Sequence, residues 1–333
     1  MEKELRLFVA PSPHLRSGDK VSGAMRDVII ALLPITIVAI ALFKLYAVFL
    51  IAVCLVTAAL TELIFRKVMG KQATLYDGSA ILTGLLVALC FSAGTPWWTA
   101  ALATFIGVGV AKELVGGLGW NRFNPALFGR VSVILLVPVF QYITGFFAPL
   151  RQYFGAINPL DLQTGAVDTV TTATPLALLA QGEAGNIGSL FLFHQGGGLG
   201  ESSALALILG GLYLVFRKHI TLHIPVAIIV PVLVLGLLDT GGAGAMAPIA
   251  HVLTGGVLLG AFFMATDWVT SPINTSGKII FGLCIGVLIM VFRLWLAPVE
   301  GTAFAILIMN AFVPAIDKAT RRLTFGATKE ASA

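Results

Sequence analysis

The sequence has little charge. Of its 333 residues, 11% are Asp, Glu, Lys or Arg, whereas about a quarter of the residues in a typical soluble domain are charged. Hydrophobic residues make up 58% of the chain, and the mean hydropathy is +0.96. This composition excludes a soluble globular domain and predicts an integral membrane protein. The net charge of +5 is explained by the usual excess of Lys and Arg in cytoplasmic loops, so no nucleic-acid partner is expected.

Cysteine and histidine are also scarce. The three cysteines lie in separate apolar runs, which excludes a disulfide framework and a thiolate metal cluster and predicts packing residues: Cys54, Cys90 and Cys284. The histidines have no ligand spacing, so no haem or metal site is expected, and we expect interfacial or solvated positions for His14, His194, His219, His223 and His251. No cleavable apolar leader precedes the first hydrophobic segment, which should remain in the mature protein.

The sequence contains many long hydrophobic runs. A hydrocarbon core of about 30 Å requires roughly 20 apolar residues per helix. The chain offers ten candidate spans, some of them short: 25–43, 46–65, 79–93, 97–115, 125–142, 203–217, 222–238, 246–264, 277–293 and 299–316. The predicted fold class is therefore an all-α polytopic membrane protein with about ten transmembrane helices.

The distribution of Lys and Arg predicts the orientation of these spans. With the N-terminus in the cytoplasm, eighteen basic residues fall inside and three fall outside, namely Lys44, Arg151 and Arg293. Such a division is typical of membrane proteins, so both termini are expected inside. The chain then divides into a cytoplasmic arm (1–24), a first five-helix half (25–142), an extracytoplasmic loop (143–202), a second five-helix half (203–316) and a cytoplasmic tail (317–333).

The two halves share short similarities. Ile81-Leu82-Thr83-Gly84 recurs loosely as Val252-Leu253-Thr254-Gly255, and each is expected to open the third helix of its half. Asn124-Pro125-Ala126 has a weaker counterpart in the segment from Asn310 to Pro314. Because a tandem repeat of five spans places its copies in opposite orientations, the expected architecture is an inverted repeat. Chance similarity among membrane helices is the alternative.

Two segments combine helix-breaking residues with an acid: Glu113 to Pro125, and Thr266 to Pro272. Irregular backbone at membrane depth is tolerated where it is buried in protein or lines a cavity, so these are candidate cofactor or ion sites. Ordinary cytoplasmic connections are the alternative. Since a carboxylate in a membrane must be paired or carry an ion, Glu113 and Asp267 are the ion-coupling candidates. The competing interpretation pairs Glu113 with Lys112 or Arg122.

Other acids at the ends of predicted spans have simpler explanations. Arg66 lies one turn from Glu62, which predicts a surface ion pair. Asp77 precedes Gly78 and a predicted helix start, which is typical of a residue that caps a helix.

The extracytoplasmic loop contains a threonine-rich segment, Asp168-Thr-Val-Thr-Thr-Ala-Thr-Pro-Leu176. Its order resembles the flavinylation signature of the Rnf and Nqr respiratory complexes, in which an Asp precedes a Ser/Thr-Gly/Ser/Thr-Ala-Thr core. The last threonine of that core is esterified to the phosphate of FMN. The resemblance implies a covalent FMN phosphoester at Thr174, with an attachment motif of Asp168, Thr171, Thr172 and Ala173. Thr172 stands where many members have glycine.

The resemblance covers nearly the whole chain. Three further segments, 21–28, 116–126 and 260–272, are similar to the NqrB/RnfD family. This family comprises the D subunit of the Rnf complex and its paralogue, the B subunit of the sodium-pumping NADH:quinone oxidoreductase. The short N-terminal arm favours the Rnf member. Because a threonine hydroxyl without a neighbouring base is a poor nucleophile, attachment of the flavin implies a separate flavin transferase.

The resemblance implies a redox subunit of an ion-translocating oxidoreductase that is not catalytic alone. Such a complex passes electrons between ferredoxin and NAD and moves Na⁺ or H⁺ across the prokaryotic inner membrane. The resemblance also implies covalent FMN on the extracytoplasmic side and room for a second non-covalent flavin such as riboflavin. It further implies contact with membrane lipid and partner subunits that carry iron–sulfur clusters and flavin. Two alternatives stay open: the quinone-reductase paralogue, and a secondary transporter, for which ten spans with broken helices are also typical.

Overall fold

The computed structural model describes residues 21–72, 74–92, 94–144, 175–180, 186–194, 196–239, 246–296 and 301–321. Regular structure in this part of the chain is helical, and its one β-type pairing is an isolated bridge between Ser92 and Gly198. The polytopic helical fold predicted from the sequence agrees with this architecture.

The longest helix is α1 (Val21–Val68), with 48 residues. A straight helix of this length would extend about 72 Å, more than twice the thickness of a hydrocarbon core. Its backbone leaves the helical conformation at Lys44 (φ 50°, ψ −133°), between the predicted spans 25–43 and 46–65. The two arms of α1 therefore correspond to two predicted spans.

The remaining helices lie close to the predicted segments. In the first half they are η1 (Leu75–Asp77), α2 (Ser79–Cys90), α3 (Trp97–Phe105), its π-helical continuation η2 (Ile106–Leu114) and α4 (Pro125–Thr144). Next come α6 (Pro175–Ala180), α7 (Ile187–Leu192) and η4 (Leu199–Glu201). The second half contains α8 (Ala204–Phe216), α9 (His223–Gly236), α10 (Ala247–Leu253), α11 (Val257–Leu259), η6 (Gly260–Met264), α12 (Thr275–Val291), η7 (Phe292–Leu296) and α13 (Gly301–Ala319).

Helix length limits the number of membrane spans. Among the described residues, three helices are long and apolar enough to cross a membrane: α1, the continuous helix of α12 and η7, and α13. A fourth is present if α10 and α11–η6, which are bent by 58°, count as one broken span. Helices α2, α8 and α9 are apolar but have 12, 13 and 14 residues. The structure therefore supports a polytopic membrane protein without fixing ten spans.

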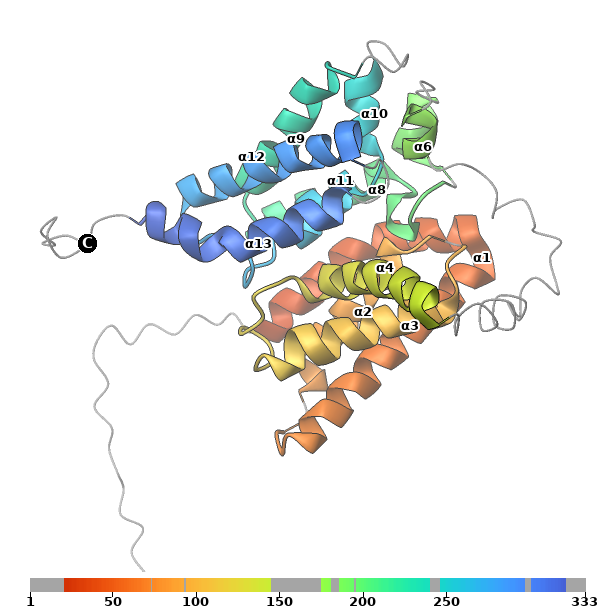
Figure 1. The fold of residues 1–333 in the computed structure, drawn as a ribbon, viewed down its shortest axis with the longest axis vertical. Helices are drawn as coiled ribbons and strands as arrows, with labels where there is room; N and C mark the ends of the chain where they lie inside the picture. The colour runs from red at the N-terminus through yellow and green to blue at the C-terminus, as the bar shows by residue number, and fades with distance from the viewer. Residues whose placement is uncertain are drawn as a thin grey trace, which may run out of the picture.

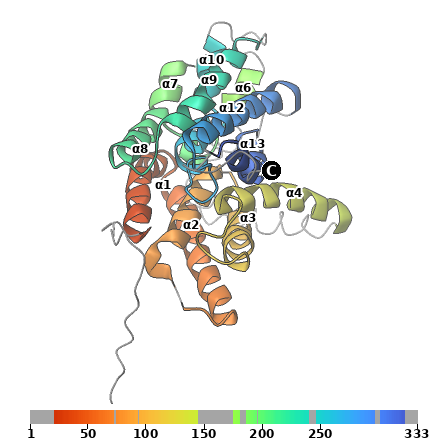
Figure 2. The same ribbon diagram turned by 90° about the vertical axis from the view of Figure 1, so that its left-hand side faces the viewer.

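The two halves pack side by side. Helices α1 to α4 lie together in one part of the molecule, and α9, α10, α12 and α13 lie together in the other (Figures 1 and 2). Helix α8 packs against α1, and α13 contacts α4, so both halves share one apolar core. Leu32 and Leu89 from the first half and Ile228 and Ile285 from the second are fully buried in it. The cavity described below lies at this contact between the halves.

The halves resemble each other most where a π-helix ends. Helix η2 leads through residues 115–124 to α4, and η6 leads through residues 265–274 to α12. Each connection is irregular, as predicted, and each ends in an asparagine that immediately precedes the next helix, Asn124 and Asn274. The prediction that Ile81–Gly84 and Val252–Gly255 each open a helix agrees with the first segment, which lies near the start of α2, and is wrong for the second, which closes α10.

Candidate functional site

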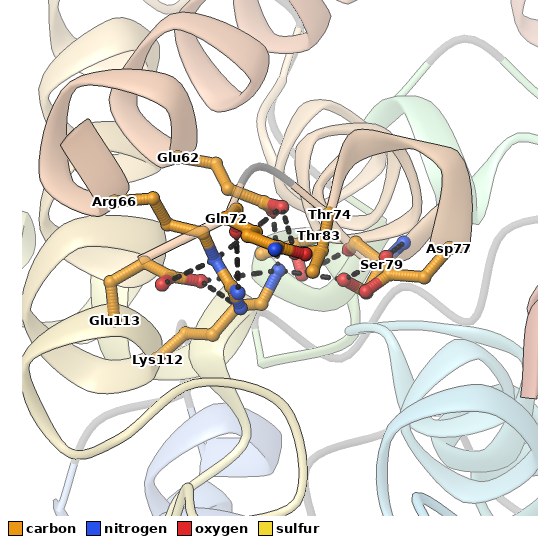
Figure 3. Close-up of polar contacts among 9 residues, drawn as sticks. All are labelled: Glu62, Arg66, Gln72, Thr74, Asp77, Ser79, Thr83, Lys112 and Glu113. Atoms are coloured by element: carbon orange, nitrogen blue, oxygen red, sulfur yellow. Dashed lines mark hydrogen bonds and ion pairs between the residues drawn. The ribbon is translucent and has the colours of Figure 1, made fainter. Parts of the chain in front are cut away.

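Four charged side chains meet inside the first half (Figure 3). The Nζ atom of Lys112 lies 2.7 Å from Oε2 of Glu62 and 3.6 Å from Oε1 of Glu113. The Nε atom of Arg66 lies 3.0 Å from Oε2 of Glu113. Both glutamates are fully buried, and Lys112 is 1% exposed. Two acids and two bases thus balance one another in a site from which water is excluded, where an unpaired charge is costly.

Two helices supply this charge cluster of Glu62, Arg66, Lys112 and Glu113. Glu62 and Arg66 lie one turn apart near the end of α1, and Lys112 and Glu113 lie near the end of η2. The predicted ion pair of Glu62 and Arg66 is present, at 3.9 Å, but its predicted surface location is wrong: Glu62 is buried, and its closer partner is Lys112. The interpretation that pairs Glu113 with Lys112 is confirmed, although Arg66 rather than Arg122 supplies the second base.

Hydroxyl groups connect the charge cluster to the start of α2. The Thr74 hydroxyl donates to Oε1 of Glu62 at 2.7 Å, and Lys112 donates to the Ser79 hydroxyl at 2.7 Å. Asp77 accepts from the Ser79 backbone N–H at 2.7 Å and from its hydroxyl at 2.6 Å. The N-cap residue of α2 is Gly78 rather than Asp77, so the predicted N-cap position is wrong, but Asp77 satisfies the first amide of α2 as predicted. The same carboxylate orients the hydroxyl that Lys112 contacts.

A cavity of about 310 Å³ lies next to the charge cluster, between the two halves. The first half contributes Lys112, Ser79 and Asn121 to its wall, and the second contributes Asp267, Trp268 and Phe262. Most of the wall is apolar. A mostly apolar cavity of this size with a few convergent polar groups is typical of a small-molecule site.

The two predicted ion-coupling acids lie in different surroundings. Glu113 belongs to the charge cluster, and Lys112 rather than Glu113 borders the cavity. Asp267 follows η6, borders the cavity, and accepts a hydrogen bond from the Thr270 hydroxyl at 3.1 Å. Desolvation raises the pKa of the Asp267 carboxyl, and the bonds from the Thr270 side chain and neighbouring backbone N–H groups oppose that rise. The two acids therefore do not form one site.

Two asparagines join the halves beside the cavity. The Asn124 side-chain oxygen caps α4 by accepting from the N–H groups of Ala126 and Leu127, and its amide donates to the Met264 carbonyl at 3.2 Å. With its amide oriented to satisfy its neighbours, Asn310 accepts from the Asn124 N–H at 3.1 Å and donates to the Thr270 carbonyl at 3.1 Å. The sequence paired these residues as repeat counterparts; in the structure they are direct contacts.

A second polar site lies where α10 breaks. Arg293, which is 7% exposed, donates to the carbonyls of His251 at 2.6 Å, Thr254 at 2.8 Å and Gly255 at 3.2 Å. These carbonyls lie at the C-terminal end of a helix, which carries partial negative charge. Arg293, which the charge count assigns to the outside, is therefore buried against a helix end. Its charge stabilises the broken helix.

The end of α2 has a similar arrangement in the first half. Arg130 of α4 donates to the carbonyl of Cys90, the last residue of α2. The segment around η4 lies against the same helix end, because the Leu199 N–H donates to the Phe91 carbonyl at 2.8 Å. Both interrupted helices thus end in carbonyls that an arginine from another helix contacts.

The predicted attachment residues Asp168, Thr171, Thr172, Ala173 and Thr174 lie outside the described residues. The next residues, Pro175 to Ala180, form α6. Leu176 and Leu179 pack with Ala250 of α10. A Cβ atom added at Gly255 would lie 2.9 Å from Leu176 and 2.3 Å from the Arg293 guanidinium, so α6 begins beside the α10 break.

His223 is exposed, as predicted, whereas His194 and His251 are buried. His251 is 4% exposed and lies 3.0 Å from Asp239, while the His219 ring lies 2.6 Å from Oδ2 of Asp27. His194 is 9% exposed, and burial lowers the pKa of its imidazole. No group of three His, Cys, Asp or Glu side chains in the described ranges forms a metal site. Cys54 and Cys90 are buried, which agrees with their predicted packing role.

Sequence reasoning missed Lys112, Arg66 and Glu62 as members of one site. One signal was present: Lys112 and Glu113 are adjacent charges near the end of an apolar span, and the cost of burying both requires partners nearby. Which residues were the partners depended on α1 passing η2, a contact 50 positions apart in the sequence. No spacing rule predicts such a contact.

Together, the apolar helices, the broken helix, the buried charges and the cavity between the halves define a polytopic α-helical membrane protein with an internal polar site. Residues 8–326 match the family model described as NQR2, RnfD, RnfE family, so the chain belongs to this family.

Similar proteins are known over the full length of the chain. One is the D subunit of the Na(+)-translocating ferredoxin:NAD(+) oxidoreductase complex of Acetobacterium woodii, 38% identical over 98% of this chain and 97% of that protein. Another is the D subunit of the proton-translocating ferredoxin:NAD(+) oxidoreductase complex of Clostridium ljungdahlii, 37% identical over 96% of both chains. The D subunit of the ion-translocating oxidoreductase complex of Stutzerimonas stutzeri is 36% identical over 92% of both.

Proposed function

We propose that the chain is the D subunit of an Rnf-type complex and relays electrons in ferredoxin:NAD oxidoreduction coupled to Na⁺ or H⁺ translocation. The names and the full-length coverage of its relatives support this function. The protein works in the prokaryotic inner membrane with the other subunits of the complex. Electron transfer within the chain requires a bound redox group, which we assign to FMN esterified to Thr174.

The observation that carries this assignment is the position of α6. Consecutive Cα atoms are about 3.8 Å apart, so Thr174 adjoins Pro175 at the start of α6. Leu176, two residues after Thr174, flanks Gly255 together with the Arg293 guanidinium. A buried cation near the attachment point suits a cofactor that carries a phosphate. The flavin would supply the redox chemistry, while the chain supplies position and electrostatics.

The cavity between the halves is our candidate for a second, non-covalent flavin such as riboflavin. Its apolar wall, with Phe262 and Trp268, suits a flat aromatic ring, and the buried side-chain oxygen of Asn121, which has no hydrogen-bond partner among the described residues, offers an acceptor. Denaturation of the purified protein should release this flavin into the supernatant while any covalent flavin stays with the polypeptide. Asn121→Leu should lower the released flavin and leave the covalent flavin unchanged.

In-gel fluorescence tests the covalent flavin. The protein made together with a flavin transferase should give a fluorescent band after denaturing electrophoresis, and Thr174→Ala should abolish it. Thr171→Ala, the matched control within the same motif, should weaken the band at most. An intact but dark band would contradict the assignment and favour a secondary transporter, which the broken helix and the cavity also suit. A subunit of the quinone-reductase paralogue would also give a fluorescent band. Ferredoxin and quinone must therefore be compared as redox partners of the complex to distinguish the two.

Asp267 is the stronger of the two ion-coupling proposals, because it borders the cavity outside the charge cluster. Asp267→Asn should lower ion transport or change its dependence on ion concentration while flavin content stays normal. For Glu113→Gln the same measurement needs a stability control, since Glu113 pairs with Arg66 and Lys112. Normal pumping by a folded, flavin-loaded Asp267→Asn protein would refute the role of this acid.

We also propose ten spans in two inverted halves with both termini in the cytoplasm. The similar connections after η2 and η6 support the repeat. Cysteines introduced at Ser189 or Gln163 should react with an impermeant thiol reagent from outside, and one at Ala327 should react after the membrane is opened. The opposite labelling pattern would reverse the topology and the side of the flavin.

A further inference from the structure

A second, more polar pocket opens at one end of the molecule. It has a volume of about 990 Å³ and lies between the start of α1, residues 76–78, the turn after α8 and Trp268. Three basic side chains border it, Arg26, Arg217 and Lys218. All three are exposed.

The acids of this basic pocket are already engaged. Asp27 lies 2.8 Å from the Arg217 guanidinium and 2.6 Å from the His219 ring. Asp77 accepts two hydrogen bonds from Ser79. Hydrogen bonds leave the charge of Asp77 in place, so three basic side chains and two acids give the pocket one net positive charge. Neither Arg26 nor Lys218 has an ion-pair partner of its own among the described residues.

The backbone holds Lys218 in an unfavourable conformation. Its φ is 63°, one of two positive φ values found for non-glycine residues in the described part of the chain. For an L-residue this left-handed conformation is unfavourable, because it brings Cβ too close to the following carbonyl oxygen. The turn is fixed from both sides, because the Lys218 N–H donates to the Val215 carbonyl at 2.9 Å and the Trp268 indole donates to the His219 carbonyl at 2.6 Å. Strain of this kind gathers at functional sites.

The basic pocket continues into apolar surroundings. Val21, Ala24, His219 and Trp268 border both this pocket and the apolar cavity between the halves. Phe216, next to Arg217, is 84% exposed. Exposed aromatic side chains next to basic residues at helix ends are typical of the membrane–water interface. A ligand here would meet positive charge at one end and apolar surface at the other.

We infer that this pocket binds the phosphate of an anionic membrane phospholipid, with Arg26 and Lys218 as the phosphate contacts and the acyl chains directed along the apolar surface that includes Phe216. Basic pockets between membrane helices bind such headgroups. The continuity with apolar surface favours a lipid over free phosphate. The inference does not depend on the redox reaction.

A titration of the detergent-purified full chain tests this inference, with short-chain phosphatidylglycerol as the probe and phosphatidylcholine and inorganic phosphate as comparisons. Each basic residue near a membrane surface contributes about a fivefold gain in affinity for anionic lipid. We therefore expect Arg26→Gln with Lys218→Gly to weaken phosphatidylglycerol binding by about 25-fold. Lys218→Gly also relieves the backbone strain, so it alone should give about a fivefold loss in a protein of unchanged or higher stability. Arg217 is left intact because it holds Asp27.

The matched control is Lys67→Gln with Lys71→Gln, which removes two exposed basic residues outside the pocket. Full affinity in this control, with loss in the pocket variants, supports the lipid site. An equal loss in the control would mean general electrostatic attraction and overturn the inference. So would unchanged binding by the pocket variants, or phosphatidylcholine binding as tightly as phosphatidylglycerol. Inorganic phosphate that competes at the same concentration as the lipid would make this a free-phosphate site and overturn the lipid assignment.

Discussion

The charge cluster of the first half and the α10 break of the second bury charge in opposite ways. In the cluster, Glu62, Glu113, Lys112 and Arg66 neutralise one another through side chains, and the helices that carry them stay continuous. At the break, Arg293 is balanced largely by backbone carbonyls that the interrupted helix leaves free. One site uses four charges and keeps its helices intact, whereas the other interrupts a helix to hold one charge.

This difference bears on which sites stabilise the fold and which take part in function. Both of these sites stabilise the fold, and neither is suited to bind a further ion. A closed set of two acids and two bases has little capacity to bind a further ion, because each charge already has a partner. Carbonyls at a broken helix are the groups that coordinate cations in many membrane proteins, but here a guanidinium occupies them. Neither site is therefore free to pass an ion. The cavity with Asp267 is therefore the site at which we propose ion coupling.

The largest expected effect comes from breaking the charge cluster. Glu62→Gln keeps the shape of the side chain but leaves Lys112 with Glu113 at 3.6 Å as its remaining acid. Removing one partner of a buried ion pair costs about 3–5 kcal/mol, and we expect a loss of this size in the free energy of unfolding. Unfolding of the detergent-solubilised protein by heat or denaturant measures it.

A double variant tests whether Glu62 and Lys112 stabilise each other. Glu62→Gln with Lys112→Gln should be less destabilised than the sum of the single variants, because neither charge is then left alone. Lys67→Gln, an exposed neighbour on the same helix, should change stability by less than about 0.5 kcal/mol. Additive effects of the two cluster variants would mean that Glu62 and Lys112 do not stabilise each other.

A smaller loss is expected at the α10 break. Arg293→Gln removes a charged donor from three carbonyls and should cost about 2–3 kcal/mol. The loss is smaller than in the cluster because no opposite charge is stranded and Thr302 still donates to the Gly255 carbonyl at 2.8 Å. Arg293→Lys should recover part of the stability. Amide hydrogen exchange in α10 should become faster in the Arg293→Gln protein, which would show that the loss of stability lies there. Unchanged exchange in α10 would show that Arg293 does not stabilise the end of this helix.

The sequence predicted the positions of the helices well because hydrophobic runs and basic turns are local signals. It predicted the irregular segments after η2 and η6 from their glycines and prolines. It missed the break in α10, since Thr254-Gly255-Gly256 is compatible with a membrane helix until Arg293, far along the chain, offers its carbonyls a donor. The charge cluster was missed for the same reason. Local patterns place each charge on a helix, whereas its partner depends on which helices cross.

Gly255→Ala tests how closely Arg293 fits the break. Gly255 has a φ of +63°, and a Cβ atom there would lie 2.3 Å from the Arg293 guanidinium. We expect a cost of about 2 kcal/mol from backbone strain and displacement of the arginine. Gly119→Ala is the matched control, because Gly119 also has a positive φ of +93° but no atom lies within 4 Å of its added Cβ. Equal losses in thermal unfolding would show that the contact with Arg293 adds nothing to the strain.

The smallest effect is expected at the edge of the charge cluster, where Asp77 satisfies the first amide of α2. Asp77→Ala removes the acceptor of the Ser79 N–H and hydroxyl and should cost about 1 kcal/mol, similar to the loss of a helix cap. Asp77→Asn keeps an acceptor oxygen and should lose less. The Ser79 hydroxyl also accepts from Lys112, so Asp77 and the cluster are joined through one side chain. If they act together, Asp77→Ala should destabilise the Glu62→Gln protein by a different amount than it destabilises the parent. Equal losses in the two backgrounds would show that the Asp77–Ser79 contact and the charge cluster contribute to stability independently of each other.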